Sequence, residues 1–323
     1  EVEPGRVVAM ANVHLPSDPY GPDALRDGAT TEEVLALERA VRLPKIKPYL
    51  EILTPLVERG IPVFMTGDFN APAHTDWVEA MIGTRPFLNR VVDWPVSRAV
   101  TEAGFKDSWR VVYPDPVTDP GLTWWAGRPP LELYSPGEND VQDRIDFLWF
   151  DGPATVQSSE IVGEANRADV PISVMPWPSD HRAVVSQFKV ISAPMPSLIS
   201  TVHRVYRTGE NVEVYTHTPA DTPAIVTLTR VEDAQLVIAE QSADSTGHLV
   251  FPGTLFTPGE YKIAMGSADN NAPLSRGFWV LEVGATPTVE VMGLAFNQND
   301  PIEIRWHNSP GNRNDYVKVY RLD

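Results

Sequence analysis

The chain changes character near residue 190, and this change most restricts its fold. Up to about Val190, stretches with helical periodicity alternate with short apolar runs that are typical of buried strands. Beyond that point only strand and turn patterns occur. The segment 192–197 between the two parts is rich in Pro and Ser, as linkers are. The sequence therefore predicts an α+β chain: a layered domain of helices and sheets over 1–191, followed by all-β modules.

The first part contains the patterns of both element types. Thr30 followed by Glu33 has the signature of a capping box, which predicts that a helix begins there. Pro44, Pro48 and Pro55 are expected to bend or divide the long helical stretch that follows. Buried strands are expected over residues 6–15, 61–66, 144–150, 156–162 and 183–190.

The second part contains an internal repeat. The text VYRTGENVEVYTHTP, beginning at Val205, aligns with AFNQNDPIEIRWHNS, beginning at Ala295, at an offset of 90 residues. Alternating strands repeated at this length favour tandem immunoglobulin-like β-sandwiches. We therefore expect one whole module over 197–284 and the truncated start of a second over 286–323.

Composition excludes several classes of site. The chain has no cysteine, so disulfides, thiolate metal sites and cysteine nucleophiles are excluded. A net charge of -17 argues against a chain-wide surface for polyanions, so that any nucleic-acid contact would be a local groove. No apolar run reaches the roughly 18 residues of a membrane span. We expect a secreted, cell-surface or periplasmic protein whose export signal has already been removed.

Polar clusters lie at the ends of the predicted strands of the first part. They are His14 in the text NVHL, the segments 67–70 (GDFN) and 179–181 (SDH), and the segment 143–146 (DRID) at the start of a strand. Each cluster alone is explained as well by a turn or a solvated strand end. Together they place many polar groups at the edge of an apolar core, where burial is costly unless the groups are paired. We expect them to converge on one site.

Five pieces of text occur in an informative order over residues 6–190: NVHL, GDFNAP, GLTWW, DRIDFLWF and SDHRAVVSQF. In this order and spacing they resemble the endonuclease/exonuclease/phosphatase superfamily, the metal-dependent phosphoesterases related to DNase I. The resemblance implies a four-layer α/β/β/α sandwich with the site at one edge of the two packed sheets. It also implies a divalent cation, Mg²⁺ or else Mn²⁺ or Ca²⁺, for which carboxylate and amide oxygens are suitable ligands.

The resemblance implies a role for each matching residue. His181 would contact the scissile phosphate or act as general acid or base, and Asp146 would orient it. Asp68 would align the attacking water or bind the metal. Asn70 would hydrogen-bond a non-bridging phosphate oxygen.

Three further roles follow from the same resemblance. Asp180 would bind or help to place the metal ion. His14 would contact the phosphate as a second histidine. Asp143 matches the position from which a partner of His14 comes.

One part of the family pattern has no match. The first half of such a fold normally supplies an Asn and the Glu that is the main Mg²⁺ ligand, and Glu1 and Glu3 lie too close to the NVHL strand to be that Glu. We therefore expect the N-terminal half of the fold to be missing from these 323 residues, and these residues alone to bind Mg²⁺ poorly and to hydrolyse substrates slowly.

Two functions remain open. The first is an exported, divalent-metal-dependent phosphoester hydrolase acting on nucleic acid, a phospholipid headgroup or a small phosphoester, with β modules that contact a cell surface or a glycan. The second is a non-catalytic extracellular binding or adhesion protein that retains a degenerate phosphoesterase scaffold. The retained Asp68, Asn70, Asp146, Asp180 and His181 favour the enzyme, because a scaffold has no physical need for them together.

Overall fold

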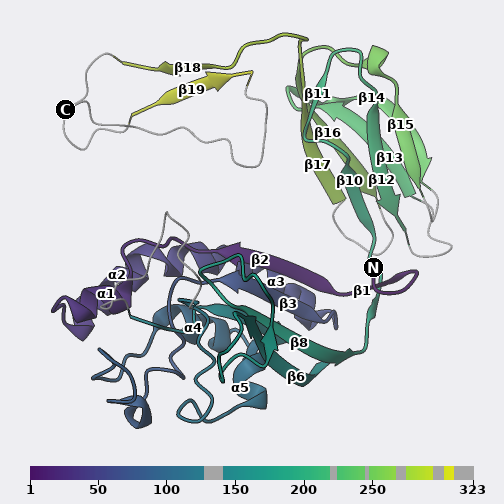
Figure 1. The fold of residues 1–323 in the computed structure, drawn as a ribbon. Helices are drawn as coiled ribbons and strands as arrows, with labels where there is room; N and C mark the ends of the chain where they lie inside the picture. Colours follow the sequence, from purple (N-terminus) through teal and green to yellow (C-terminus); the bar gives the residue numbers. More distant parts are fainter. Residues whose placement is uncertain (127–140, 219–223, 244–246, 267–273, 294–301, 309–323) are drawn as a thin grey trace. The chain divides into compact units, whose positions relative to one another are not determined.

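The computed structural model describes residues 1–126, 141–218, 224–243, 247–266, 274–293 and 302–308. The chain divides into two compact units, Glu1–Pro194 and Met195–Asp323. Each unit is described by itself (Figure 1).

The first unit contains two principal sheets and a set of helices. One sheet has the strand order β2-β3-β5-β4 and the other the order β7-β6-β8, while β1 pairs with β9. The strands are β1 (Arg6–Val7), β2 (Ala9–His14), β3 (Val63–Asp68), β4 (Lys106–Asp107), β5 (Asp146–Asp151), β6 (Ala154–Gly163), β7 (Ile172–Ser173), β8 (Ala183–Val190) and β9 (Ala193–Pro194). The helices are α1 (Gly21–Arg26), α2 (Thr31–Val41), α3 (Leu43–Glu58), the 3₁₀ turn η1 (Glu79–Met81), α4 (Pro95–Glu102) and α5 (Ser108–Val112).

The predicted capping box is confirmed. Thr30 is the N-cap of α2: its side chain accepts from the Glu33 amide, and the Glu33 carboxylate accepts from the Thr30 amide. The division of the long helical stretch falls at Arg42, where Pro44 near the start of α3 fits the first turn of a new helix. Pro48 and Pro55, in contrast, lie inside α3.

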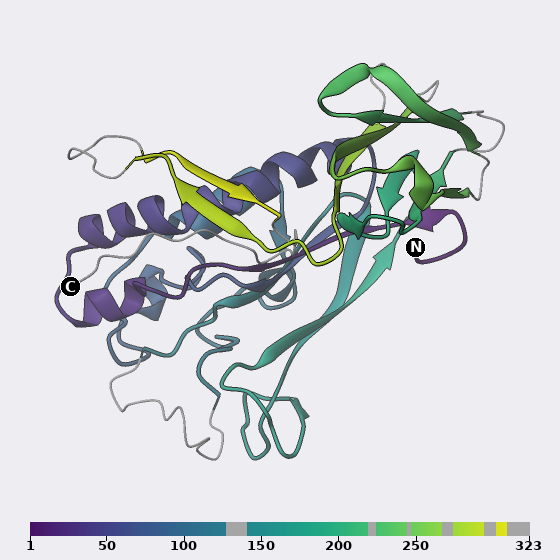
Figure 2. The ribbon, with the colours of Figure 1, turned by 90° about the horizontal axis from the view of Figure 1, so that it is seen from above.

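Helices cover one face of the four-stranded sheet. Figure 1 shows α3 along β2 and β3, and Figure 2 shows this helix and the two strands from above. Alternate residues of each strand point to this face, as strand geometry requires. The shared core includes Val13, Val63, Met65, Phe147 and Trp149 from the strands, with Ile46, Leu50, Leu53, Val96 and Val100 from α3 and α4.

The three-stranded sheet packs on the opposite face. Phe188 of β8 makes edge contacts with Phe64 of β3 and Phe150 of β5, at ring-centroid distances of 4.9 and 5.0 Å. On the other side of β8, Val185 is 47% exposed. The described residues thus form a helix layer and two sheets. No helix among them covers the outer face of β8, so the fourth layer of the predicted sandwich stays a prediction.

A buried arginine ties the loop after β2 to the helices. Arg42 pairs with Glu38 at 2.6 Å, and both side chains are fully buried. The same guanidinium donates to the carbonyls of Pro16, Ser17 and Pro19 at 2.7 to 2.9 Å. Because a guanidinium offers five donors in a fixed plane, one side chain fixes both the helix junction and the loop.

Arg42→Met tests this anchor. The change leaves the Glu38 carboxylate buried without its cation, and we expect a loss of about 3–5 kcal/mol in the free energy of unfolding. Urea denaturation of the protein measures it. The double variant Glu38→Leu/Arg42→Met should recover part of the loss, since it buries no charge. A loss below about 1 kcal/mol for Arg42→Met would mean that the loop is held by other contacts.

A second buried ion cluster holds the start of β5. Asp76 accepts from Arg144 at 2.9 and 3.0 Å and from Arg110 at 2.8 Å, and Arg144 also donates to Asp107 at 2.6 Å. Burial opposes ionisation of Asp76, but the charges of Arg144 and Arg110 outweigh it and hold the pKa of this carboxyl below its ordinary value.

This lowered pKa predicts an acid-sensitive stability. The folded protein holds the Asp76 proton less tightly than the unfolded chain, so the contribution is complete above the ordinary pKa of 3.8 and is lost as pH falls through the lower native value. We expect Asp76→Asn to be less stable than wild type at pH 7 and to lose less stability on acidification. Urea denaturation between pH 3 and 7 measures both, with exposed Asp115→Asn as the matched control. Parallel pH curves for wild type and Asp76→Asn would contradict the assignment.

The second unit contains two sheets around one core of its own. Their strand orders are β10-β12-β15 and β11-β17-β16-β13-β14. The strands are β10 (Leu198–Thr201), β11 (Val205–Arg207), β12 (Val212–His217), β13 (Ala224–Arg230), β14 (Asp233–Ala243), β15 (His248–Phe251), β16 (Gly259–Gly266) and β17 (Leu274–Leu281), with the 3₁₀ turn η2 at Gly253–Leu255. Both sheets contribute to the core, for example through Val212, Val214, Val226, Ile263 and Phe278.

The predicted second module is described only in part. Strands β18 (Thr288–Val291) and β19 (Ile304–His307) form an antiparallel pair. β19 ends at His307, as β12 ends at His217, in agreement with the repeat offset. The remainder of the aligned text falls mostly on 294–301, which lies outside the described residues, as does 309–323. Assignment of either module as immunoglobulin-like stays a prediction.

Candidate active site

Strand register brings three of the predicted site residues into one row. β2 pairs parallel with β3 so that His14 lies opposite Asp68, and β3 pairs antiparallel with β5 so that Asp68 lies opposite Asp146. Paired residues on neighbouring strands project to the same side of a sheet. The row therefore combines two carboxylates and an imidazole that are far apart in the sequence.

A glycine permits this close pairing. Gly67 has φ +133°, and a Cβ built on it would lie 1.9 Å from the carbonyl oxygen of Val13 on β2. No side chain fits between the two strands there. The glycine of the GDFN text is thus required where β2 and β3 approach each other, one residue before the row.

Asp68 is the centre of the arrangement. Its Oδ1 accepts from the Asn70 amide at 2.7 Å, and its Oδ2 accepts from the Asn70 side-chain nitrogen at 2.8 Å. The Nε2 atoms of two histidines approach the same Oδ2, His14 at 3.6 Å and His181 at 4.0 Å. The structure therefore brings Asp68 and His181 within a side chain's reach, as the sequence predicts.

The hydrogen-bond partners of Asn70 differ from the phosphate oxygen that the resemblance implies. It has φ +48°, in the left-handed region that Asn tolerates, and its side-chain nitrogen donates both to Asp68 and to the Leu15 carbonyl. Both amide hydrogens are thus used inside the protein. In this arrangement Asn70 positions Asp68 and the loop after β2, and its donors are not directed at an open phosphate position.

The environment of Asp68 raises the pKa of its carboxyl above the ordinary value. Burial first, and then repulsion from the Asp146 carboxylate, raise the pKa of Asp68 to about 6, although the Asn70 amide and both histidines act in the opposite direction. A bound cation would relieve the repulsion between these two partly buried carboxylates.

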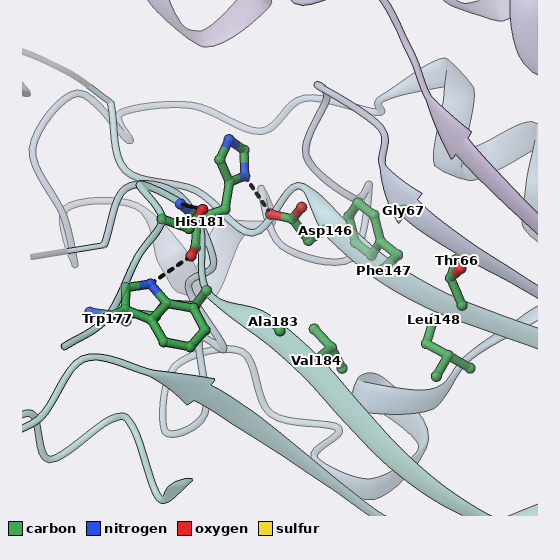
Figure 3. Close-up of a pocket in the computed structure, with 11 residues that line it drawn as sticks. Thr66, Gly67, Asp146, Phe147, Leu148, Trp177, His181, Ala183 and Val184 are labelled. Atoms are coloured by element: carbon green, nitrogen blue, oxygen red, sulfur yellow. Dashed lines mark hydrogen bonds and ion pairs between the residues drawn. The ribbon is translucent and has the colours of Figure 1, made fainter. Parts of the chain in front are cut away.

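Asp146 and His181 form a direct pair. His181 Nδ1 lies 2.9 Å from Asp146 Oδ2, and Figure 3 shows the ring turned toward this carboxylate. Trp177 Nε1 donates to the carbonyl of His181 at 2.9 Å and so helps to hold its backbone. Burial lowers the pKa of His181, but the hydrogen bond and charge of Asp146, with Asp68 and Asp180, outweigh it and raise the pKa above its ordinary value. The pair leaves Nε2 as the ring atom that faces Asp68.

The structure gives Asp143 and His14 different partners from those expected. The Asp143 carboxylate is fully buried and accepts from Trp77 Nε1 at 2.9 Å, Tyr20 Oη at 3.3 Å and Arg85 at 3.3 Å. His14, whose side chain is 75% exposed, approaches Asp68 instead. Asp143 is buried too deeply to reach an exposed edge residue, so it acts as an acceptor for the residues that support the site.

Asp180 lies in a cavity of about 380 Å³ with the other site residues. The lining includes His14, Tyr20, Asp68, Asn70, Trp124, Asp180 and His181. Arg182 directly follows His181 in the sequence, but its guanidinium is not available to a phosphate. It donates to Glu164 at 2.6 and 3.0 Å and to Asp169 at 2.7 Å. These bonds fix the chain directly after His181.

A threonine to which the sequence analysis gave no role connects the start of β5 with the segment that contains His181. The Thr123 hydroxyl accepts from the backbone amides of Ile145 and Asp146 at 3.0 and 3.1 Å. The Thr123 carbonyl accepts from the Arg182 amide at 2.7 Å. Thr123 is fully buried and belongs to the GLTWW text, so the motif itself was the available signal. It sets the spacing between Asp146 and His181.

Thr123→Val tests this positioning role. The change keeps the shape but leaves the buried Ile145 amide and the part-buried Asp146 amide without an acceptor, at about 1–3 kcal/mol in the free energy of unfolding for the buried one. Because Asp146 would also be displaced, we expect the pKa of His181 to fall, measured by NMR titration of its ring. Thr123→Ser keeps the hydroxyl and should keep the wild-type titration. A destabilised Thr123→Val with an unchanged His181 titration would restrict Thr123 to a structural role.

The side chains present fit a divalent cation. One ligand atom each from Asp68, Asp146 and His181 lie within 4.8 Å of one another. The carboxylates are suited to Mg²⁺, Mn²⁺ or Ca²⁺, whereas an imidazole is a less usual ligand for Mg²⁺ and Ca²⁺. Asp180, which the resemblance implies as a metal residue, is not in this group, while Asp146 is.

Comparison with known families agrees with this geometry. The family described as endonuclease/exonuclease/phosphatase matches residues 6–181, which contain every residue of the row and of the Asp146–His181 pair. The chain belongs to this family. Endonuclease/exonuclease/phosphatase proteins are typically hydrolytic phosphoesterases that depend on a divalent metal, in accord with the two carboxylates at the site.

One relative is the uncharacterized protein F14F9.5 of Caenorhabditis elegans. It is 31% identical over 201 residues, which cover 58% of this chain and 62% of the relative. The chain thus spans less than two thirds of that protein's length. In the described part of the chain, no helix combines the length and the apolar character that crossing a bilayer requires.

Proposed function

We propose that this protein is a divalent-metal-dependent phosphoester hydrolase in which a water molecule, rather than a side chain, attacks phosphorus. The observation that supports it most is the convergence of His14, His181 and Asp146 on Asp68, with His14 and His181 both facing one carboxylate oxygen. A phosphodiester is already anionic, so attack on it needs charge neutralisation and a positioned water more than a covalent intermediate.

Each residue has a place in this reaction. Asp146 keeps the proton on Nδ1 of His181, which leaves Nε2 to exchange a proton with a phosphoryl oxygen or with water. Asp68 accepts hydrogen bonds from the backbone amide and from the side-chain nitrogen of Asn70, and in this fixed position it orients the attacking water. His14 lies on the opposite side of Asp68 and contacts the phosphate. Asp68 and Asp146 would hold the cation, which supplies charge neutralisation when bound.

The proposal also covers the substrate class and the nature of the second unit. Nucleic acid, phospholipid headgroups and small phosphoesters are all candidates, and a panel of plasmid DNA, sphingomyelin and inositol phosphates distinguishes them. We assign the second unit as immunoglobulin-like modules of a secreted or cell-surface protein, supported by two sheets around a shared core.

Turnover of bis-p-nitrophenyl phosphate by the intact protein tests the reaction. We expect it to require Mg²⁺ or Mn²⁺ and to stop with EDTA. Asp68→Asn and His181→Gln should lower kcat/KM by about 10²–10⁴-fold, because each removes a group that acts on water or phosphate. His248→Gln, in the second unit, should leave it unchanged. Metal-independent turnover, or turnover that survives both substitutions, would show that this site is not the catalytic one.

A further inference from the structure

A second cavity opens on the other side of His14. It has a volume of about 480 Å³ and is lined by His14, Leu15, Pro16, Ser17, Lys45 and Tyr49. His14 and Ser17 also line the cavity that contains Asp68 and His181. The two cavities are therefore adjacent, and His14 stands between them.

The floor of this second cavity is held in place. Arg42 binds the carbonyls of Pro16 and Ser17, and Asn70 binds the carbonyl of Leu15. One end of the loop is thus fixed by a buried guanidinium and the other by the residue that positions Asp68. A cavity whose walls are already fixed loses little conformational entropy when it binds a ligand.

Helix α3 supplies the opposite wall. Lys45 and Tyr49 are four residues apart and so lie on one face of the helix, directly after the Arg42 anchor. Lys45 is exposed, and within the described ranges it makes no ion pair with a carboxylate. Tyr49 is half-buried against the core below. The fixed loop and the helix together place a cationic group and a phenol in the same cavity as His14.

The charge of the two cavities is opposite. The cavity on the catalytic side is lined by four carboxylates, those of Asp18, Asp23, Asp68 and Asp180. No residue that lines the second cavity is acidic, and one is Lys45. In a protein of net charge -17 this local reversal gives an anionic group a preferred position.

We propose that this second cavity binds a second phosphate of the substrate, through the Lys45 ammonium group with the Tyr49 hydroxyl as a further donor. The inference rests on the proposed hydrolase function. With the scissile phosphorus between His14 and His181, a phosphate one unit along the substrate lies on the Lys45 side. The favoured substrates therefore carry two phosphates, either a nucleotide backbone or a bisphosphorylated polyol, whereas sphingomyelin has a cationic choline group in place of the second phosphate.

A matched pair of substrates tests it. Thymidine 5′-(p-nitrophenyl phosphate) and its 3′-phosphorylated form share one leaving group and differ only in the second phosphate. We expect the second phosphate to lower KM about tenfold in wild type, which corresponds to one charge-assisted contact. Lys45→Gln should abolish that advantage, so that the two substrates have equal KM values. Lys47→Gln, on the far side of the same helix, should retain it.

Equilibrium binding separates this inference from the proposed reaction. Titration calorimetry with thymidine 3′,5′-bisphosphate and thymidine 5′-monophosphate reports the Lys45 contact even if nothing is hydrolysed, in which case only the proposed reaction fails. The same calorimetric comparison of inositol 1,4-bisphosphate with inositol 1-monophosphate tests the bisphosphorylated polyols. A preference that Lys45→Gln removes in either arm supports the inference and identifies the source of the phosphate. No preference in wild type, or an equal preference in Lys45→Gln, overturns it.

Discussion

The register of β2, β3 and β5 is the constraint on which the rest of the site depends. Because side chains alternate between the two faces of a sheet, a slip of one residue in either pairing would turn His14 or Asp146 away from Asp68. The close approach at Gly67 makes such a slip costly, since any other residue there would collide with β2. The site is therefore specified by backbone pairing first and by side-chain chemistry second.

Buried arginines then hold the segments that carry the proposed catalytic groups. Arg42 binds the loop that follows His14, Arg144 precedes Asp146 by two residues, and Arg182 directly follows His181. Each is essentially inaccessible and paired with carboxylates. Desolvating such pairs is expensive, so their net contribution to stability is small. Their geometric effect is larger, because a planar guanidinium with several fixed acceptors leaves the adjacent backbone few alternatives.

The sequence predicted those parts that depend on local pattern. The capping box at Thr30, the strand Ala183–Val190 and the order of the polar clusters follow from spacing along the chain. It did not predict that Asp143 is enclosed by Trp77, Tyr20 and Arg85, because that neighbourhood joins segments more than 50 residues apart. Nor did it predict that the Thr123 hydroxyl accepts from the amides of Ile145 and Asp146, on a segment that the chain reaches only after more than 20 further residues. Contacts of this kind depend on how layers pack, and no local periodicity records them.

The charge differs between the two cavities that His14 lines, so the two sides of the site attract different groups. On one side, repelling carboxylates favour a cation and thereby the phosphate that it neutralises; on the other, a lysine and a phenol favour an anion without a metal. A substrate with charge at only one phosphorus can use only the first side. In the proposed reaction, a substrate with two phosphates would use both sides in one orientation, since the reverse orientation would place the second phosphate against Asp18 and Asp23. If the proposed function is correct, the same asymmetry reconciles the net charge of -17 with an anionic substrate, because the attraction is local and acts on the two phosphates.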